Sequence, residues 1–157
     1  MSMRIKKVKI TSDDKVAVSY DQQSKTGSWD EYSFTCSEKA RPEFYEALNA
    51  LAPHVIEMCE LPEDYLSRIK VRGVSFSYRG EKQVMGATII AQMELFYSNT
   101  DLNINTPHKA SDSYNDQPAD ENQLLTDECI DALDVLCDEV KLYIQGERAQ
   151  LRLFGVA

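Results

Sequence analysis

The stretch TDECIDALDVLCDEVKLYIQG, residues 126–146, decides how this chain folds. Its apolar residues recur every three or four positions, so they line one face of an α-helix. These residues are Ile130, Leu133, Leu136, Cys137, Val140, Tyr143 and Ile144. Thr126 is a suitable N-cap, and Gly146 is the residue type that commonly follows the last helical turn. The apolar face spans only about two heptads, so we expect this helix to pack on a sheet rather than in a coiled coil.

Segments with the two-residue repeat of β-strands precede this helix. Val16, Val18 and Tyr20 alternate with polar residues, as do later aromatic positions. The predicted strands cover residues 3–10, 16–20, 32–36, 71–78 and 84–97. Gly86 interrupts the last of them, which indicates a bulge or a close approach of another group.

A second helical pattern separates the first three strands from the last two. Pro42 suits a first helical position, and apolar residues then repeat at helical spacing up to Cys59. Pro53 is expected to kink this helix or to divide it in two. Residues 62–66 look like one extra turn. The order βββ-α-ββ-α predicts an α+β domain, with an antiparallel sheet of about five strands and helices on one face.

The domain organisation follows from where these patterns stop. Residues 1–146 are expected to form a single domain, and residues 147–157 a tail. Within the domain, residues 98–125 lose periodicity and are rich in Asn, Asp, Ser and Pro. Such a composition is typical of a functional loop or of a disordered segment, and the sequence does not choose between them.

The net charge of −9 disfavours direct binding to nucleic acid, because neutralising phosphates requires a basic surface. The charge is uneven, however. Four cations, Arg4, Lys6, Lys7 and Lys9, lie in the first strand, whereas residues 112–139 contain ten carboxylates and no Lys or Arg. That acidic run is either a solvated loop and helix face or a surface that binds a basic partner.

The sequence also gives expectations for the cellular location and for cofactors. No apolar run approaches the roughly 20 residues of a membrane helix, and residues 1–7 show no secretory signal, so we expect a cytoplasmic protein without membrane contact. The cysteines lack the spacing of a metal site and are expected to be free thiols. They are Cys36, Cys59, Cys129 and Cys137. We predict no metal and no cofactor.

No recognised catalytic motif is present in the sequence, so we predict no catalytic residues and no enzymatic activity. Residues 72–78 are loosely similar to the aromatic strand of RNA-recognition domains. This similarity leaves open a replication or recombination accessory that binds single-stranded nucleic acid through Phe76, Tyr78 and the basic first strand. The same two aromatic residues also fit the core side of an alternating strand.

The tail carries the most specific functional signal. Gln150, Leu151, Leu153 and Phe154 match the pattern Gln-Leu-x-Leu-Phe, which resembles the peptide that bacterial proteins insert into the replication sliding clamp. A chance match is expected in roughly one chain of this length in several hundred. The resemblance implies that Gln150 supplies a polar contact, the two leucines aliphatic contacts and Phe154 the aromatic anchor. The alternative is a short strand whose leucines face the sheet.

The chain as a whole is similar to small acidic proteins of unknown function from phages and prophages of Gram-positive bacteria. The segments that carry this similarity are residues 29–38, 71–78, 84–89 and 105–109. We therefore expect a non-enzymatic adaptor or inhibitor that binds the host sliding clamp. The alternatives are an acidic DNA mimic or anti-defence protein directed at a basic host protein, and the single-stranded nucleic-acid-binding accessory.

Overall fold

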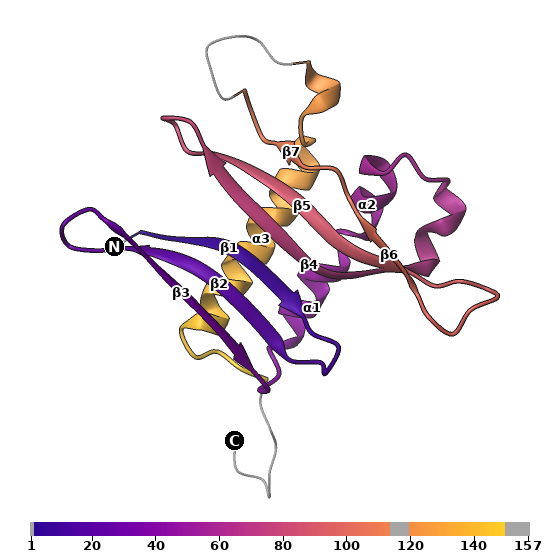
Figure 1. Ribbon diagram of the computed structural model, residues 1–157, viewed down its shortest axis with the longest axis horizontal. Helices are drawn as coiled ribbons and strands as arrows, with labels where there is room; N and C mark the ends of the chain where they lie inside the picture. The colour runs from indigo at the N-terminus through magenta and orange to yellow at the C-terminus, as the bar shows by residue number, and fades with distance from the viewer. Residues whose placement is uncertain (1, 114–119, 150–157) are drawn as a thin grey trace, which may run out of the picture.

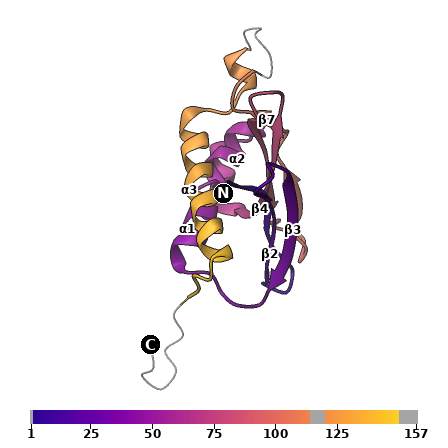
Figure 2. The same ribbon diagram turned by 90° about the vertical axis from the view of Figure 1, so that its left-hand side faces the viewer.

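The computed structural model describes residues 2–113 and 120–149, which form an antiparallel sheet with helices on one face (Figures 1 and 2). The predicted α+β class is confirmed. The strands are β1 (Met3–Ile10), β2 (Val16–Gln23), β3 (Trp29–Cys36), β4 (Ile69–Arg79), β5 (Val84–Met93), β6 (Leu102–Asn105) and β7 (Lys109–Ala110). The helices are α1 (Pro42–Asn49), α2 (Ala52–Met58) and α3 (Asp127–Ile144), with 3-10 turns η1 (Glu63–Arg68) and η2 (Glu121–Gln123).

The strand order β3-β2-β1-β4-β5-β6 places the two sequence-separated groups of strands side by side, with β7 alongside β5. The groups meet where Lys9 of β1 pairs with Gly73 of β4. A Cβ atom at residue 73 would lie 2.3 Å from the Val8 carbonyl oxygen. Glycine is therefore required at this junction, because the β1 backbone occupies the space of a side chain.

The prediction of about five strands was too low, because the sheet has seven. Both additional strands, β6 and β7, lie within residues 98–125, where no regular structure was expected. β6 is a short, largely exposed edge strand, and β7 has two residues, so neither is long enough to show an alternating pattern. Their pairing with β5 comes from tertiary contact. The backbone N–H of Ile89, for example, donates to the Thr106 hydroxyl at 2.8 Å.

The ends of α3 and the break between α1 and α2 lie where the sequence predicted them. The Thr126 hydroxyl accepts a hydrogen bond from the Cys129 N–H at 3.1 Å, as an N-cap should. Gly146 has a φ of 107°, which suits the left-handed residue after a helix. Pro53 lies in the first turn of α2 and divides the predicted helix into α1 and α2.

Tyr143 of α3 joins the helical layer to the sheet. Its side chain is fully buried and stacks on Phe34 of β3, with ring centroids 6.2 Å apart. The ring centroid of Phe44 in α1 lies 6.0 Å away. The Tyr143 hydroxyl donates to the Glu38 carbonyl oxygen at 2.5 Å, which satisfies its one polar atom within the core.

A partly buried ion pair adds a second connection between α1 and α3. The Arg41 guanidinium, just before α1, donates from Nε and Nη2 to the two carboxylate oxygens of Glu139, both at 2.7 Å. These hydrogen bonds hold the pKa of Glu139 below its ordinary value. The carboxylate is nearly buried, so loss of its charge leaves Arg41 without its partner.

We expect Glu139→Gln to lower the free energy of unfolding by about 1–2 kcal/mol near neutral pH. Asp138→Asn, a matched change at the exposed neighbouring residue, should alter it by about 0.5 kcal/mol or less. A group with a lowered folded pKa stabilises the fold above its unfolded pKa of about 4.3 and loses that contribution as the pH falls through the folded value. Urea unfolding should therefore show the gap between wild type and Glu139→Gln closing on acidification. Equal losses in the two variants, or a gap independent of pH, would contradict this role.

Candidate functional site

The predicted clamp-binding residues, Gln150, Leu151, Leu153 and Phe154, lie outside the described residues. The short strand that was the alternative prediction for these residues also lies outside the described residues. The described chain ends one residue before the motif, and the contacts of its last residues give the position from which the motif continues.

That position is held at the C-terminal end of α3. The backbone N–H of Ala149 donates to the Lys39 carbonyl oxygen at 2.9 Å. The Arg148 guanidinium lies 3.6 Å from the centroid of the Tyr143 ring and forms an ion pair with Glu38 at 3.0 Å. Residue 149 is therefore tied to the β3–α1 connection, at one end of the helical layer (Figure 1).

The face of the sheet opposite the helices forms a second candidate surface. All three helices lie on one side in Figure 2, so alternate residues of the strands face away from them. Lys7 and Lys9 are on this open face because their neighbour Val8 is fully buried on the helical side. The polar residues of the open face include Ser19, Ser33, Thr35, Arg72, Ser75, Ser77, Thr88, Gln92, Asn103 and Asn105.

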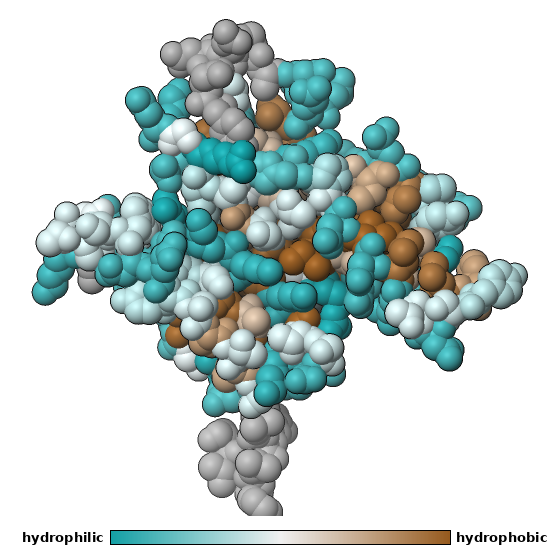
Figure 3. All heavy atoms as spheres, in the orientation of Figure 1, coloured by the Kyte–Doolittle hydropathy of each residue, from teal (hydrophilic) through white to brown (hydrophobic). Residues whose placement is uncertain are grey.

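Three shallow depressions cross the open face and share lining residues. One, of about 480 Å³, lies over β1, β4, β5 and β6 and is lined by Arg72, Asn105 and other residues. A second, also of about 480 Å³, lies over β1, β2 and β3 and shares Lys9 with the first. The third, of about 360 Å³, shares Ser19 and Ser33 with the second. We call this connected surface the open-face strip. Hydrophilic residues run across the middle of this face in Figure 3, with apolar areas beside them.

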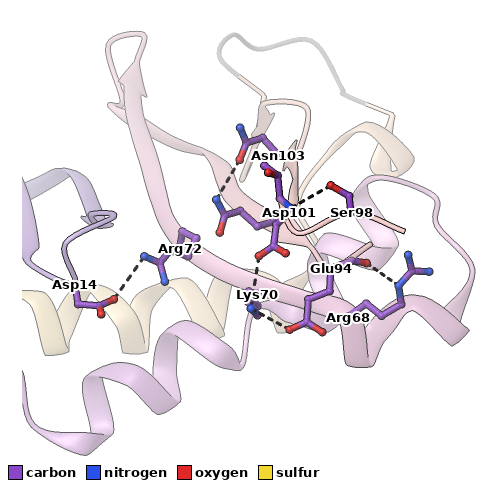
Figure 4. A network of polar contacts seen from close by, with 10 residues as sticks. Asp14, Arg68, Lys70, Arg72, Glu94, Ser98, Asp101 and Asn103 are labelled. Carbon is purple, nitrogen blue, oxygen red and sulfur yellow. Dashed lines mark hydrogen bonds and ion pairs between the residues drawn. The ribbon is translucent and has the colours of Figure 1, made fainter. Parts of the chain in front are cut away.

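Most carboxylates on this side pair with cations other than the two central lysines; Glu31, which lines the third depression, forms no ion pair with a described residue. Figure 4 shows Lys70 between Glu94 and Asp101, at 2.9 and 3.5 Å, and Arg72 reaching toward Asp14 at 3.9 Å. Asp21, which is nearly buried, pairs with Arg4 at 3.1 Å and with Lys6 at 4.0 Å.

Lys7 and Lys9 form no ion pair with any described residue. The centre of the open-face strip is therefore positive, although the whole chain is acidic. The Arg72 guanidinium also donates to the Thr11 carbonyl oxygen at 2.9 Å, which fixes the end of the β1–β2 turn beside the first depression.

A serine–histidine pair lies on the same face. Ser77 Oγ and His108 Nε2 are 2.7 Å apart, and the imidazole lies against Gly86. Burial and the nearby charge of Arg79 lower the pKa of His108, which favours the neutral ring. No described carboxylate hydrogen-bonds the other ring nitrogen, so the pair lacks the orienting group of a catalytic triad. Its clearest role is to hold the β6–β7 connection on the sheet. Gly86 thus marks a close approach, one of its two predicted roles.

All acidic residues of α3 except Glu139 are exposed. Exposed carboxylates are Asp127, Glu128, Asp131, Asp134 and Asp138. Partial burial and the charges of Asp138 and Asp131 raise the pKa of Asp134. The exposed surface of α3 is thus predominantly acidic.

The two aromatic residues considered for nucleic-acid binding, Phe76 and Tyr78, have structural roles. Phe76 is buried under the helices, and the Tyr78 hydroxyl donates to the Ile5 carbonyl oxygen at 2.8 Å, so neither ring is open to a nucleobase. The four cysteines are free thiols. The described residues contain no cluster of His, Cys, Asp and Glu suited to a metal ion.

Comparison with known proteins gives no match to a family model, to a curated protein or to a solved structure. None of the helices in residues 2–113 and 120–149 is long and apolar enough to cross a membrane.

A double-mutant cycle tests the contact between Gly86 and His108. A Cβ at residue 86 would lie 2.5 Å from His108 Nε2, so we expect Gly86→Ala to cost about 1–3 kcal/mol of unfolding free energy. In the His108→Ala background this cost should fall by about 1 kcal/mol or more. Gly27→Ala is the control, because residue 27 has a φ of 89° but no atom within 4 Å of its Cβ position. Its cost should be independent of residue 108. Additive effects of the changes at residues 86 and 108 would refute the contact.

Proposed function

We propose that this protein is a non-enzymatic phage or prophage adaptor that binds the bacterial replication sliding clamp through residues 150–154. The observation that carries the proposal is the sequence Gln150-Leu151-Arg152-Leu153-Phe154, which combines an amide, two aliphatic anchors and an aromatic anchor in the order that the clamp pocket accepts. A phage or prophage origin, which rests only on the sequence resemblance of residues 29–38, 71–78, 84–89 and 105–109, would fit a role at the host replication machinery.

The surroundings of residue 149 also support the proposal. Ala149 is tied to Lys39, and the Schellman-type hydrogen bond from Glu147 N–H to the Leu142 carbonyl oxygen, at 2.9 Å, ends α3. The apolar core of the described residues is formed between the sheet and the helices α1, α2 and α3.

Calorimetric titration of the full chain into a purified sliding clamp from a Gram-positive bacterium tests the proposal. Phe154→Ala should weaken binding by about 2 kcal/mol or more, which is roughly 30-fold in Kd, because buried aromatic anchors dominate such interfaces. Arg152→Ala, at the variable position, should change Kd by only about threefold or less. A chain that ends at Ala149 and still binds like the full chain would refute the proposal.

The acidic face of α3 favours a second candidate function, an acidic DNA mimic that binds a basic host protein. Five exposed carboxylates lie on successive turns of α3. Val135, which is 54% exposed, supplies an apolar contact among them. Such a surface accelerates association with a basic partner and is weakened by salt.

The second candidate predicts salt-sensitive binding to a purified basic DNA-binding protein of the host. Changing Asp131, Asp134 and Asp138 together to Asn should weaken this binding at least tenfold. Changing the exposed residues Glu63, Asp64 and Glu81 to their amides alters the net charge equally and serves as the control. Equal effects of the two triple variants, or binding that is insensitive to ionic strength, would exclude recognition by α3.

A further inference from the structure

We propose that the open-face strip binds single-stranded nucleic acid through its phosphate backbone, with the unpaired Lys7 and Lys9 as the main phosphate contacts and Arg72, which also pairs with Asp14, as a further one. This inference concerns a different part of the surface from the clamp-binding peptide and does not depend on it.

Charge complementarity is the first argument. Lys7 and Lys9 point in the same direction from β1, about 7 Å apart along the strand, and both are exposed. Their ammonium groups have no carboxylate partner among the described residues, whereas Asp14, Asp21, Glu94 and Asp101 pair with other cations. Glu31, which lines the depression at the β3 end of the strip, forms no ion pair with a described residue, so the positive part of the strip is its middle. Unpaired cations in the middle of a surface favour an anionic ligand, since binding releases counterions from that ligand.

The shape of the strip favours an extended ligand. The connected depressions run from β3 across β2, β1, β4 and β5 to β6, nearly perpendicular to the strands. Six strands spaced about 4.8 Å apart span roughly 24 Å. A compact anion would occupy one depression only, whereas a chain of phosphates places charges along the whole strip.

The remaining polar groups fit the parts of a single strand. Hydroxyl groups of Ser19, Ser33 and Thr35 are available to donate to phosphate oxygens on one side of Lys9. The amides of Asn103 and Asn105 lie on the other side, where they can pair with base edges that a duplex would keep hidden.

Weak base preference is expected. Phe76 and Tyr78 face the helices, so the middle of the strip has no aromatic platform for stacking. Binding should depend mainly on phosphate contacts and hence on salt.

The net charge of −9 does not exclude this site, because that charge is not spread evenly over the surface. Helix α3, which carries five exposed carboxylates, packs on the face of the sheet opposite to the open face (Figure 2). These carboxylates repel a polyanion from that side and leave the open face as the surface it can approach. The same charge pattern allows one rival occupant, an acidic polypeptide, which the experiment below distinguishes.

Fluorescence anisotropy with the full-length chain and a labelled oligothymidylate tests the inference at low and moderate salt. We expect measurable binding at low salt and at least a tenfold loss in the Lys7→Glu/Lys9→Glu variant. The control, Lys25→Glu/Lys82→Glu, makes the same charge change at exposed turns outside the strip and should alter Kd by less than threefold. A Lys7→Gln/Lys9→Gln variant, which avoids charge reversal, should reduce the slope of log K against log salt by about 1.4, or 0.7 per lost phosphate contact.

Three results would overturn the inference. They are no binding by the wild-type chain at low salt, equal losses in the two Glu variants, and displacement of the oligonucleotide by polyglutamate as effectively as by unlabelled oligothymidylate. A chain ending at Ala149 should bind the oligonucleotide normally. Loss of oligonucleotide binding and loss of clamp binding can therefore be distinguished.

Discussion

The three helices pack on a single face of the sheet, and the exposure of every other group depends on this arrangement. Tyr143 connects α3 to β3 and α1, and the Arg41–Glu139 ion pair holds α1 and α3 together. Burying one set of alternate strand residues leaves the other set in solvent. The helical period likewise turns the carboxylates of α3 outward. One-sided packing thus places the exposed carboxylates of α3 and the unpaired lysines of β1 on different faces of the sheet.

The two proposed activities fit together on this framework. The peptide at residues 150–154 follows Ala149, which is anchored beside the end of α3, whereas the open-face strip is centred on Lys9. A protein recruited to a replication clamp is brought close to DNA, where a weak, salt-dependent phosphate-binding surface becomes effective through high local concentration. Neither activity needs a cofactor or a catalytic group.

Short sequence patterns correctly predicted the helix ends and the strand faces that depend on neighbouring residues in the chain. Thr126 and Gly146 bound α3 as expected, and the alternation of Val16, Val18 and Tyr20 identified the buried side of β2. The open-face strip was not predictable in the same way. Strict alternation from Ile5 would turn Lys7 toward the core, but a β-bulge between them shifts the register and turns it outward. β6, which supplies the strip's amides, forms only because β5 offers it a partner. The clamp-binding residues lie outside the described chain and stay a prediction.

We propose that residues 150–154 make the contact with the clamp and that the folded sheet takes no part in it. Hydrogen–deuterium exchange of the full-length chain, with and without saturating clamp, tests this most directly. We expect new protection confined to the peptide that contains residues 150–154, with exchange in β1, β4 and α3 unchanged. Protection of α3 or of the sheet with residues 150–154 unaffected would contradict it.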